Sequence, residues 1–419
     1  MFLFDPIPTM IHFEKFTLSN GLQVIVHEDP TSHIAVMNLM YDVGARDEHP
    51  LKTGFAHLFE HLMFGGSCHI PVYDTPLQQV GGDNNAYTTT DLTNYYCSLP
   101  AVNLETAFWL ESDRMLGLAF NEKSLEVQRK VVVEEFKEHY LNQPYGDAWH
   151  HLTDLAYTTH PYKWPTIGQT LSHIENATMD EVKAFFYKFY RPNHAILVVA
   201  GKVTSAQVAA LCKKWFEPIP AGPAYHRALP QEPAQVCPRR KVVQGDVPFP
   251  ILYKAYHMPG KGMPGYYAAA VLCHLLSEGK SALLHANLVE KQALYTKIDA
   301  YTTESFDPGL LVISGSFPQN TPFESAENAL IEVLKTIQHT SPVALEKVKN
   351  QMETQLIFGQ VSLIHRAQEL AIATLQGDTN LVNKKIEYIR QVELDAIQAS
   401  AELILQEQNC STLHYQTIS

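Results

Sequence analysis

Residues 54–67 read GFAHLFEHLMFGGS and place His57, Glu60 and His61 within one apolar segment. The apolar residues recur with helical spacing, so the segment predicts a short amphipathic helix that ends at the paired glycines. Residues four apart share one face of a helix, and we therefore expect the His57 and His61 imidazoles side by side. Glu60 is adjacent to His61 and lies beside the pair.

This pattern, H-x-x-E-H, is the reverse of the commoner H-E-x-x-H arrangement of zinc enzymes. Two imidazoles one helical turn apart suit two ligands of a tetrahedral zinc ion, and the Glu60 carboxylate could take a proton from a metal-bound water. The alternative is a helix that buries hydrogen-bonded histidines. It is disfavoured because two histidines and a glutamate on an apolar helix are costly to bury without a partner. The sequence predicts one zinc ion per chain.

A third zinc ligand is expected from the helical segment QRKVVVEEFKEHYLNQ. Glu135 follows Val132 by three residues and shares the apolar face, which predicts an inward carboxylate. Glu134 aligns with Lys130 on a face that reads as solvated. We therefore predict Glu135 as the ligand, with Gln128 two turns earlier as an outer hydrogen-bond partner. The alternative for Glu135 is a carboxylate buried by helix packing alone.

The chain organisation follows from length and proline content. A chain of 419 residues is too long for one ordinary core. Residues 217–240 carry six prolines, which exclude a helix or an inner strand and predict an extended linker. The predicted domains are 1–216, with the metal motif, and 241–419, without it. Alternating strand and helix patterns predict an α+β fold, in which each domain has a mainly antiparallel sheet with helices on one face.

The two halves show a weak internal similarity. Aligning HLMFGGS at 61–67 with HLLSEGKS at 274–281 sets His61 against His274 and Ala270 against His57. This predicts a duplicated unit whose second copy has lost the metal motif. The alternative is that any two amphipathic helices ending in glycine can be aligned in this way.

Composition excludes several classes of protein. The net charge is −13 and no Lys/Arg cluster stands out, which disfavours nucleic acid as a partner. The first residues show neither a basic signal region nor a long apolar run, so we expect a cytoplasmic chain without a membrane span. The six cysteines have no C-x-x-C spacing, which argues against a zinc ribbon or a disulfide framework.

Three segments together carry a family resemblance: GFAHLFEHLMFGGS, GGDNNAYTTTDLTNYYCSLP and QRKVVVEEFKEHYLNQPYG. They resemble the catalytic half of the pitrilysin/insulinase zinc peptidases, especially the half-length bacterial members related to the mitochondrial processing peptidase. The resemblance implies zinc bound by His57, His61 and Glu135, with Glu60 as general base. These roles agree with those inferred from the residues themselves.

The resemblance also implies how a peptide substrate is held. An extended peptide would add to an edge strand along Asn85, Ala86, Tyr87 and Thr88, which is β-augmentation and reads backbone more than side chains. For Asn84 we favour a role in the preceding turn. The implied function is a zinc-dependent endopeptidase that hydrolyses peptides or unfolded segments in extended conformation.

One position departs from the family pattern. The second half of such peptidases supplies an Arg and a Tyr seven residues apart, which stabilise the oxyanion. Tyr295 resembles that Tyr, but Leu288 stands at the Arg position. Loss of one donor typically costs a few kcal/mol of transition-state stabilisation. We therefore expect a heterodimer with a related chain that supplies the Arg/Tyr pair, or a homodimer that uses Tyr295 alone; a one-residue alignment shift is a further alternative.

The alternative function is a non-catalytic peptide-binding or assembly subunit of a processing-peptidase-like complex. The intact residues His57, Glu60, His61 and Glu135 argue against it, while Leu288 argues for it.

Overall fold

The computed structural model describes residues 10–418, which form two compact units. The first unit comprises the chain up to Phe136 together with 165–229 and 357–384. The second comprises 137–164, 230–356 and the chain from Lys385 onward. Among the described residues, no helix is both long and apolar enough to cross a membrane. The cytoplasmic location stays a prediction.

The first unit is built on a six-stranded sheet with the order β1-β2-β6-β3-β5-β4. Strands β2 and β6 are parallel, and the other neighbours are antiparallel. The segment NAYTTTDLTNYYCSL is divided between β4 and β5, because a turn at 89–92 folds it into a hairpin. The strands are β1 Glu14–Thr17, β2 Gln23–Glu28, β3 Ile34–Tyr41, β4 Asp83–Thr88, β5 Thr93–Pro100 and β6 Ala195–Gly201.

The second unit repeats this topology in five strands with the order β7-β11-β8-β10-β9. Here β7 and β11 are the parallel pair, and the other neighbours are antiparallel. Strand for strand, the order matches β2-β6-β3-β5-β4, which supports an internal duplication and confirms the expected fold class. The strands are β7 Arg239–Gly245, β8 Ile251–Met258, β9 Lys297–Thr302, β10 Gly309–Ser316 and β11 Cys410–Thr417.

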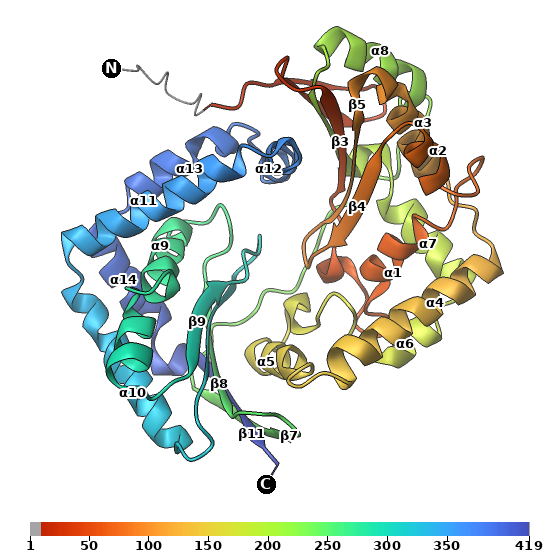
Figure 1. Ribbon diagram of the computed structural model, residues 1–419. Helices are drawn as coiled ribbons and strands as arrows, with labels where there is room; N and C mark the ends of the chain where they lie inside the picture. The colour runs from red at the N-terminus through yellow and green to blue at the C-terminus, as the bar shows by residue number, and fades with distance from the viewer. Residues whose placement is uncertain (1–9, 419) are drawn as a thin grey trace, which may run out of the picture. The chain divides into compact units, whose positions relative to one another are not determined.

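Helices cover both sheets, and each sheet also receives one helix from the other half of the sequence (Figure 1). Helix α12 packs on β6 and β3 of the first sheet, on the face opposite α1, α3 and α7. Helix α5 packs on β11, β7 and β8 of the second sheet, opposite α9 and α10. The helices are α1 Phe55–Leu62, α2 Asp74–Gln79, α3 Leu104–Leu116, α4 Glu122–Phe136, α5 Ala148–Ala156, α6 Leu171–Glu175, α7 Met179–Phe189, α8 Ser205–Trp215, α9 Tyr266–Ser277, α10 Phe323–Lys335, α11 Pro342–Gly359, α12 Leu363–Leu375, α13 Leu381–Arg390 and α14 Leu394–Ile404.

Helices α12 and α5 are both held by apolar packing and by polar contacts. Arg366 of α12 donates to His27 Nε2 at 2.7 Å and to Asp29 Oδ2 at 2.8 Å. Helix α5 rests on an apolar cluster that contains Leu152 of the helix and Leu310 of the sheet, and Arg239 Nη1 donates to the Ala156 carbonyl at its end. Successive residues of β10 belong alternately to this cluster and to the larger core on the other side, so the second sheet is apolar on both faces.

Helices α1 and α9 begin in the same way. Their N-cap residues, Gly54 and Gly265, have φ of 89° and 87°, a left-handed conformation that favours glycine. Superposing these caps sets the apolar residues of α9 against the polar triplet of α1: Ala268 against His57, Val271 against Glu60 and Leu272 against His61. The sequence-based match of His61 with His274 is thus shifted by two residues, because the helices are aligned by their beginnings.

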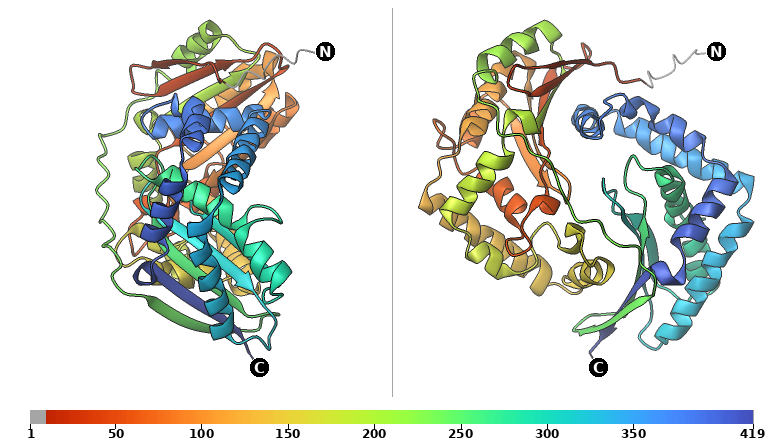
Figure 2. Two further views of the ribbon diagram at one scale, coloured as in Figure 1. Left: turned by 90° about the vertical axis from the view of Figure 1, so that its left-hand side faces the viewer. Right: turned by 180° about the vertical axis from the view of Figure 1, so that it is seen from behind.

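Within the predicted linker 217–240, residues 220–236 form no helix or strand, and β7 begins at Arg239 (Figure 2). Side chains fix it at two points. In the first unit, Arg227 Nε donates to Asp47 Oδ1 at 2.7 Å, and its Nη2 donates to Asp42 Oδ1 at 2.9 Å. In the second unit, the Glu232 carboxylate accepts the backbone N–H groups of residues 158–160. The segment is therefore held by side-chain contacts in each of the two units.

Candidate metal centre

Helix α1 is fixed at its first turn by a buried carboxylate. Glu48 is 6% exposed. Its Oε2 accepts the N–H of Gly54 and its Oε1 accepts that of Ala56, both at 2.8 Å. The N-cap glycine has no side chain to satisfy these groups, and a negative charge is favourable at the positive end of a helix. Glu48 therefore holds the helix that carries the histidines.

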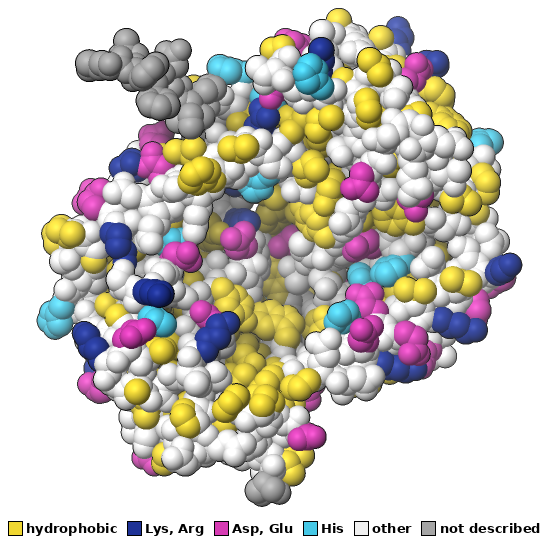
Figure 3. Space-filling view, viewed as in Figure 1, with side chains coloured by type: hydrophobic (Ala, Val, Ile, Leu, Met, Phe, Trp, Pro, Cys, Tyr) yellow, Lys and Arg dark blue, Asp and Glu magenta, His cyan; other side chains and the backbone are white. Residues whose placement is uncertain are grey.

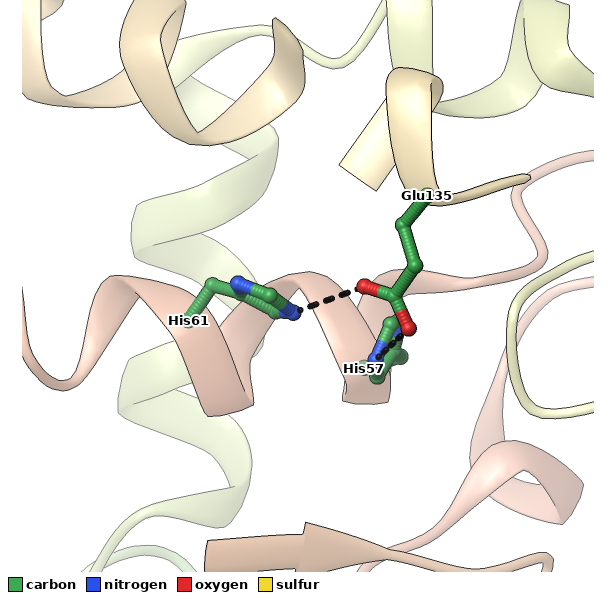
Figure 4. Close-up of side chains that lie close together, drawn as sticks. All are labelled: His57, His61 and Glu135. Carbon is green, nitrogen blue, oxygen red and sulfur yellow. Dashed lines mark ion pairs between the residues drawn. The ribbon is translucent and has the colours of Figure 1, made fainter. Parts of the chain in front are cut away.

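The structure brings His57, His61 and Glu135 together (Figure 4). Both imidazoles project from α1 toward the Glu135 carboxylate of α4. His57 Nε2 lies 3.7 Å from Glu135 Oε1, and His61 Nε2 lies 3.3 Å from Glu135 Oε2. One ligand atom from each residue falls within a group no wider than 4.8 Å. Histidine and acidic side chains also gather on the molecular surface over α1 and α4 (Figure 3).

These separations fit a bound zinc ion. Zinc bonds of about 2.0–2.1 Å in a tetrahedral arrangement place neighbouring ligand atoms about 3.3–3.4 Å apart. The 3.3 Å and 3.7 Å separations are close to that spacing, and 3.7 Å is too long for a hydrogen bond. Burial lowers the pKa of His57 to about 4, although the charge of Glu135 opposes the shift. The neutral imidazole is the form that binds a metal.

Glu60 lies on the same helix between the two histidines. Burial raises the pKa of its carboxyl group above the ordinary value, although the neighbouring Thr88 and His61 oppose the shift. Thr88 is the last residue of β4, which packs against α1, so the Glu60 carboxyl group lies near the end of that strand. This is a suitable position for a group that exchanges a proton with a reactant held along β4.

Strand β4 forms an edge of the first sheet. It pairs with β5 on one side, with Ala86 opposite Tyr95, and no strand of the described chain pairs with its other side. The predicted peptide-binding residues Asn85, Ala86, Tyr87 and Thr88 all lie on this strand. Asn84, expected in the preceding turn, lies within β4, and its side chain donates to Asp74 Oδ1 at 2.8 Å.

Helix α4 orients its two consecutive glutamates differently. Glu135 is half-buried and faces the histidines, whereas Glu134 is exposed. The apolar face of the helix made this distinction predictable from sequence. Gln128 is half-buried two turns before Glu135 on the same helix, and its role as an outer partner stays a prediction.

Tyr295 lies in a different unit from His57, His61 and Glu135. Tyr295 belongs to the second unit, is 3% exposed, and donates its hydroxyl to the Ala326 carbonyl at 2.9 Å. Leu288 is also buried in the core of the second unit. Both side chains therefore have packing roles here, and the Tyr295 hydroxyl is already engaged.

Sequence reasoning missed Glu48. It lies six residues before the glycine that begins α1, which is farther than the three-residue spacing of a capping box. In the sequence, Glu48 is recognisable only as an acidic residue in the loop before the helix that carries the two histidines.

Comparison with known proteins agrees with this fold. The family model described as Insulinase (Peptidase family M16) matches residues 23–170, and the model described as Peptidase M16 inactive domain matches residues 176–352. The chain belongs to peptidase family M16. The first match contains the whole candidate metal centre, and the second begins before α7 and covers most of the second unit.

Individual relatives span most of the chain. Zinc protease PqqE of Helicobacter pylori is 29% identical over 92% of this chain and 85% of its own length. A crystal structure of a protease from Helicobacter pylori superposes with a TM-score of 0.91 at 27% identity, covering 97% of this chain and 100% of that one. A putative M16-like peptidase from Alicyclobacillus acidocaldarius gives a TM-score of 0.86 at 19% identity, over 99% of both chains, and shows the fold alone.

Proposed function

We propose that this chain is a zinc-dependent endopeptidase that hydrolyses peptides or unfolded segments in extended conformation. The observation that carries the proposal is the convergence of His57, His61 and Glu135, with the Glu60 carboxyl group beside them and near the end of an edge strand. The family and the relatives named as zinc proteases support the same class of reaction.

His57, His61 and Glu135 would hold one zinc ion. When bound, zinc supplies a Lewis acid that polarises the scissile carbonyl and eases deprotonation of the attacking water. Three protein ligands leave one position open for that chemistry. Glu48 keeps the two histidines in register by fixing the first turn of α1.

Glu60 is proposed as the general base and then the general acid. Its carboxylate accepts a proton from the attacking water and returns that proton to the nitrogen of the departing amine. A pKa raised by burial brings the carboxyl group closer to neutrality, which suits a group that must both take and give a proton.

Strand β4 is proposed to hold the substrate backbone. Its unpaired edge can accept an extended peptide as a further strand along Asn85–Thr88, which would bring the scissile bond toward Glu60. Main-chain pairing of this kind requires an unfolded segment, and it favours extended peptides over folded domains.

The oxyanion donors are proposed to come from a second chain. Leu288 stands where the family has an arginine, and the Tyr295 hydroxyl is bonded to Ala326 in a core. A heterodimer with a related chain that carries the Arg/Tyr pair would complete the site. A homodimer would have to work without the arginine, at a cost in rate.

The second candidate is a non-catalytic peptide-binding or assembly subunit. The burial of Leu288 and Tyr295 favours it, because the second unit then offers neither donor to a substrate. Such a subunit would bind peptides along β4 without cleaving them.

One experiment separates these functions. Zinc content and cleavage of an unstructured quenched-fluorescent peptide mixture are measured for the wild type, Glu60→Gln and the exposed-surface control Glu134→Gln, each alone and with any co-purifying chain. We expect about one zinc in all three proteins and a loss of about 10²–10⁴-fold in kcat for Glu60→Gln only. Zinc without cleavage under every condition would support the binding subunit, and absence of zinc would contradict the metal centre.

A further inference from the structure

The second unit contains a cavity. All of its lining residues belong to that unit, whereas the proposed zinc ligands belong to the first unit. The cavity has a volume of about 720 Å³ and lies among α10, α14, β8 and β11. Ligand-binding cavities commonly have volumes of about 300–1,000 Å³. Its walls include Ile331, Leu334 and Leu405, whereas its base and its outer lining are charged.

The base of the cavity is formed around Glu327. Lys254 Nζ donates to Glu327 Oε1 at 2.7 Å, and Arg240 binds both carboxylate oxygens at 2.8 Å and 2.9 Å. The Lys254 and Glu327 side chains are only 5% and 7% exposed. Two cations share this one carboxylate, so the three side chains together carry one positive unit at the base of the cavity, with Arg240 half-exposed to solvent. That charge attracts an anion into the cavity.

One ring nitrogen of a histidine at the same base, His414 Nε2, has no hydrogen-bond partner among the described residues. His414 Nε2 is buried and lies 3.5 Å from Glu327 Oε2, beyond good hydrogen-bonding distance. Lys254 Nζ makes one further contact, with Thr412 Oγ1 at 3.2 Å. The base therefore offers positive charge and an unsatisfied ring nitrogen to whatever occupies the cavity.

The outer lining of the cavity has the opposite charge. Glu324, Glu402 and Glu407 line it and are exposed, with Lys335 as the opposing cation there. A simple anion is attracted by the base but repelled by this lining. A molecule with a carboxylate at one end and an ammonium group at the other complements both regions.

We propose that this cavity binds a small zwitterion, namely a free amino acid or a short peptide. Its carboxylate lies at the base against Arg240, Lys254 and His414, and its ammonium group lies against the outer glutamates. The apolar walls accommodate aliphatic side chains. The site is a second, non-catalytic peptide site in the unit that lacks the metal motif.

The probe is the dipeptide leucyl-leucine, titrated calorimetrically into the full-length chain. The titration uses the Glu60→Gln protein after zinc removal by a chelator, so that neither cleavage nor zinc contributes. N-acetyl-leucyl-leucine lacks the ammonium group, and leucyl-leucinamide lacks the carboxylate. We expect measurable binding of the free dipeptide and at least a tenfold weaker Kd for each blocked form.

Two variants test the location. Arg240→Gln removes a half-exposed cation at the base, and Glu402→Gln changes only the exposed lining without touching the buried cluster. Each is expected to weaken binding about tenfold, while Lys297→Gln, an exposed cation on β9, leaves Kd unchanged. Thermal unfolding confirms that each variant is folded. No binding of the free dipeptide, equal binding of the blocked forms, or unchanged binding by the folded Glu402→Gln protein would overturn the proposal.

Discussion

Helices α1 and α9 occupy matching places in the two units but carry different chemistry. Each begins at a left-handed glycine, and each accompanies a sheet with the same strand order. The positions that hold His57, Glu60 and His61 in α1 are Ala268, Val271 and Leu272 in α9. In the second unit the helix is therefore part of an ordinary core.

The difference between α1 and α9 shows that the three polar residues of α1 are unfavourable for packing and need a stabilising partner. Val271 and Leu272 are fully buried and stabilise the second unit by removing apolar surface from water. The corresponding residues of α1 place two imidazoles and a carboxyl group in a partly buried position, which is unfavourable without a partner. Glu135 supplies that partner, and the proposed zinc ion would stabilise the arrangement further.

The largest expected effect is loss of metal binding in Glu135→Gln. An amide is a poorer zinc ligand than a carboxylate, and loss of an outer partner alone commonly costs 10–100-fold in metal affinity. We expect zinc affinity to fall at least about 100-fold, with peptidase activity lost in parallel. Zinc content after dialysis and competition with a fluorescent chelator measures the change.

Glu134→Gln is the matched control, because it changes the neighbouring exposed carboxylate of the same helix. It should keep its zinc. If both variants lost zinc equally, or if neither did, the assignment of Glu135 as a ligand would be wrong.

The next effect concerns the start of α1. Glu48→Gln removes the charge that accepts two N–H groups at the helix N-terminus. Hydrogen bonds to a charged group contribute about 1.5–3 kcal/mol, so we expect a loss of roughly 2 kcal/mol and a Tm lower by several degrees. Calorimetry measures the shift, and zinc affinity should weaken with it. An unchanged Tm would show that Glu48 does not stabilise the first turn of α1.

Much of this comparison was predictable from sequence. The spacing of His57, Glu60 and His61 fixed them on one helix face, and the position of Glu135 beside Val132 distinguished it from Glu134. Both predictions depend only on residue spacing along a single helix, and that spacing does not depend on contacts with distant segments.

The remaining features depend on contacts between distant segments. The apolar face of α5 indicates that the helix is buried, but it does not indicate which sheet it covers. The same holds for α12, whose Arg366 finds Asp29 across more than three hundred residues. Glu48 and the Glu327 cluster lack periodicity altogether, and the alignment of His274 was misplaced because glycine-ended helices resemble one another.

Helices α12 and α5, each of which packs on a sheet from the other half of the sequence, should differ in how much stability they lose in acid. Burial lowers the pKa of His27, and its contact with Arg366 needs the neutral ring. Burial raises the pKa of Asp29, but hydrogen bonds from Thr31 and Arg366 outweigh this and lower it to about 2. Both pKa values are depressed in the folded state, so the stability they provide is present at neutral pH and is lost as pH falls, first below 6.5 and then from about 4 toward 2.

Helix α5 contacts His257, whose pKa burial also lowers, so both helices should lose stability below pH 6.5. Only α12 contacts a carboxylate with a pKa of about 2, so hydrogen exchange, corrected for intrinsic rates, is expected to show a larger loss of protection in α12 than in α5 between pH 6 and pH 3. Asp29→Asn should reduce the acid sensitivity of α12 below pH 4. Equal loss of protection in both helices would contradict the difference in their anchoring.

The smallest effect is expected from Tyr295→Phe. The variant removes one buried hydrogen bond to the Ala326 carbonyl, which corresponds to roughly 1 kcal/mol and a few degrees in Tm. Peptide cleavage should keep its kcat, because the hydroxyl is engaged in the core. A loss of kcat of tenfold or more at unchanged Tm would instead restore Tyr295 as a substrate-binding residue.

The most direct test of the central claim is anomalous X-ray diffraction at the zinc absorption edge, from crystals of the Glu60→Gln protein supplied with zinc. The account predicts one strong anomalous peak per chain, bounded by His57, His61 and Glu135, and none beside α9. Absence of a peak at these three residues, or a dominant peak in the second unit, would contradict it.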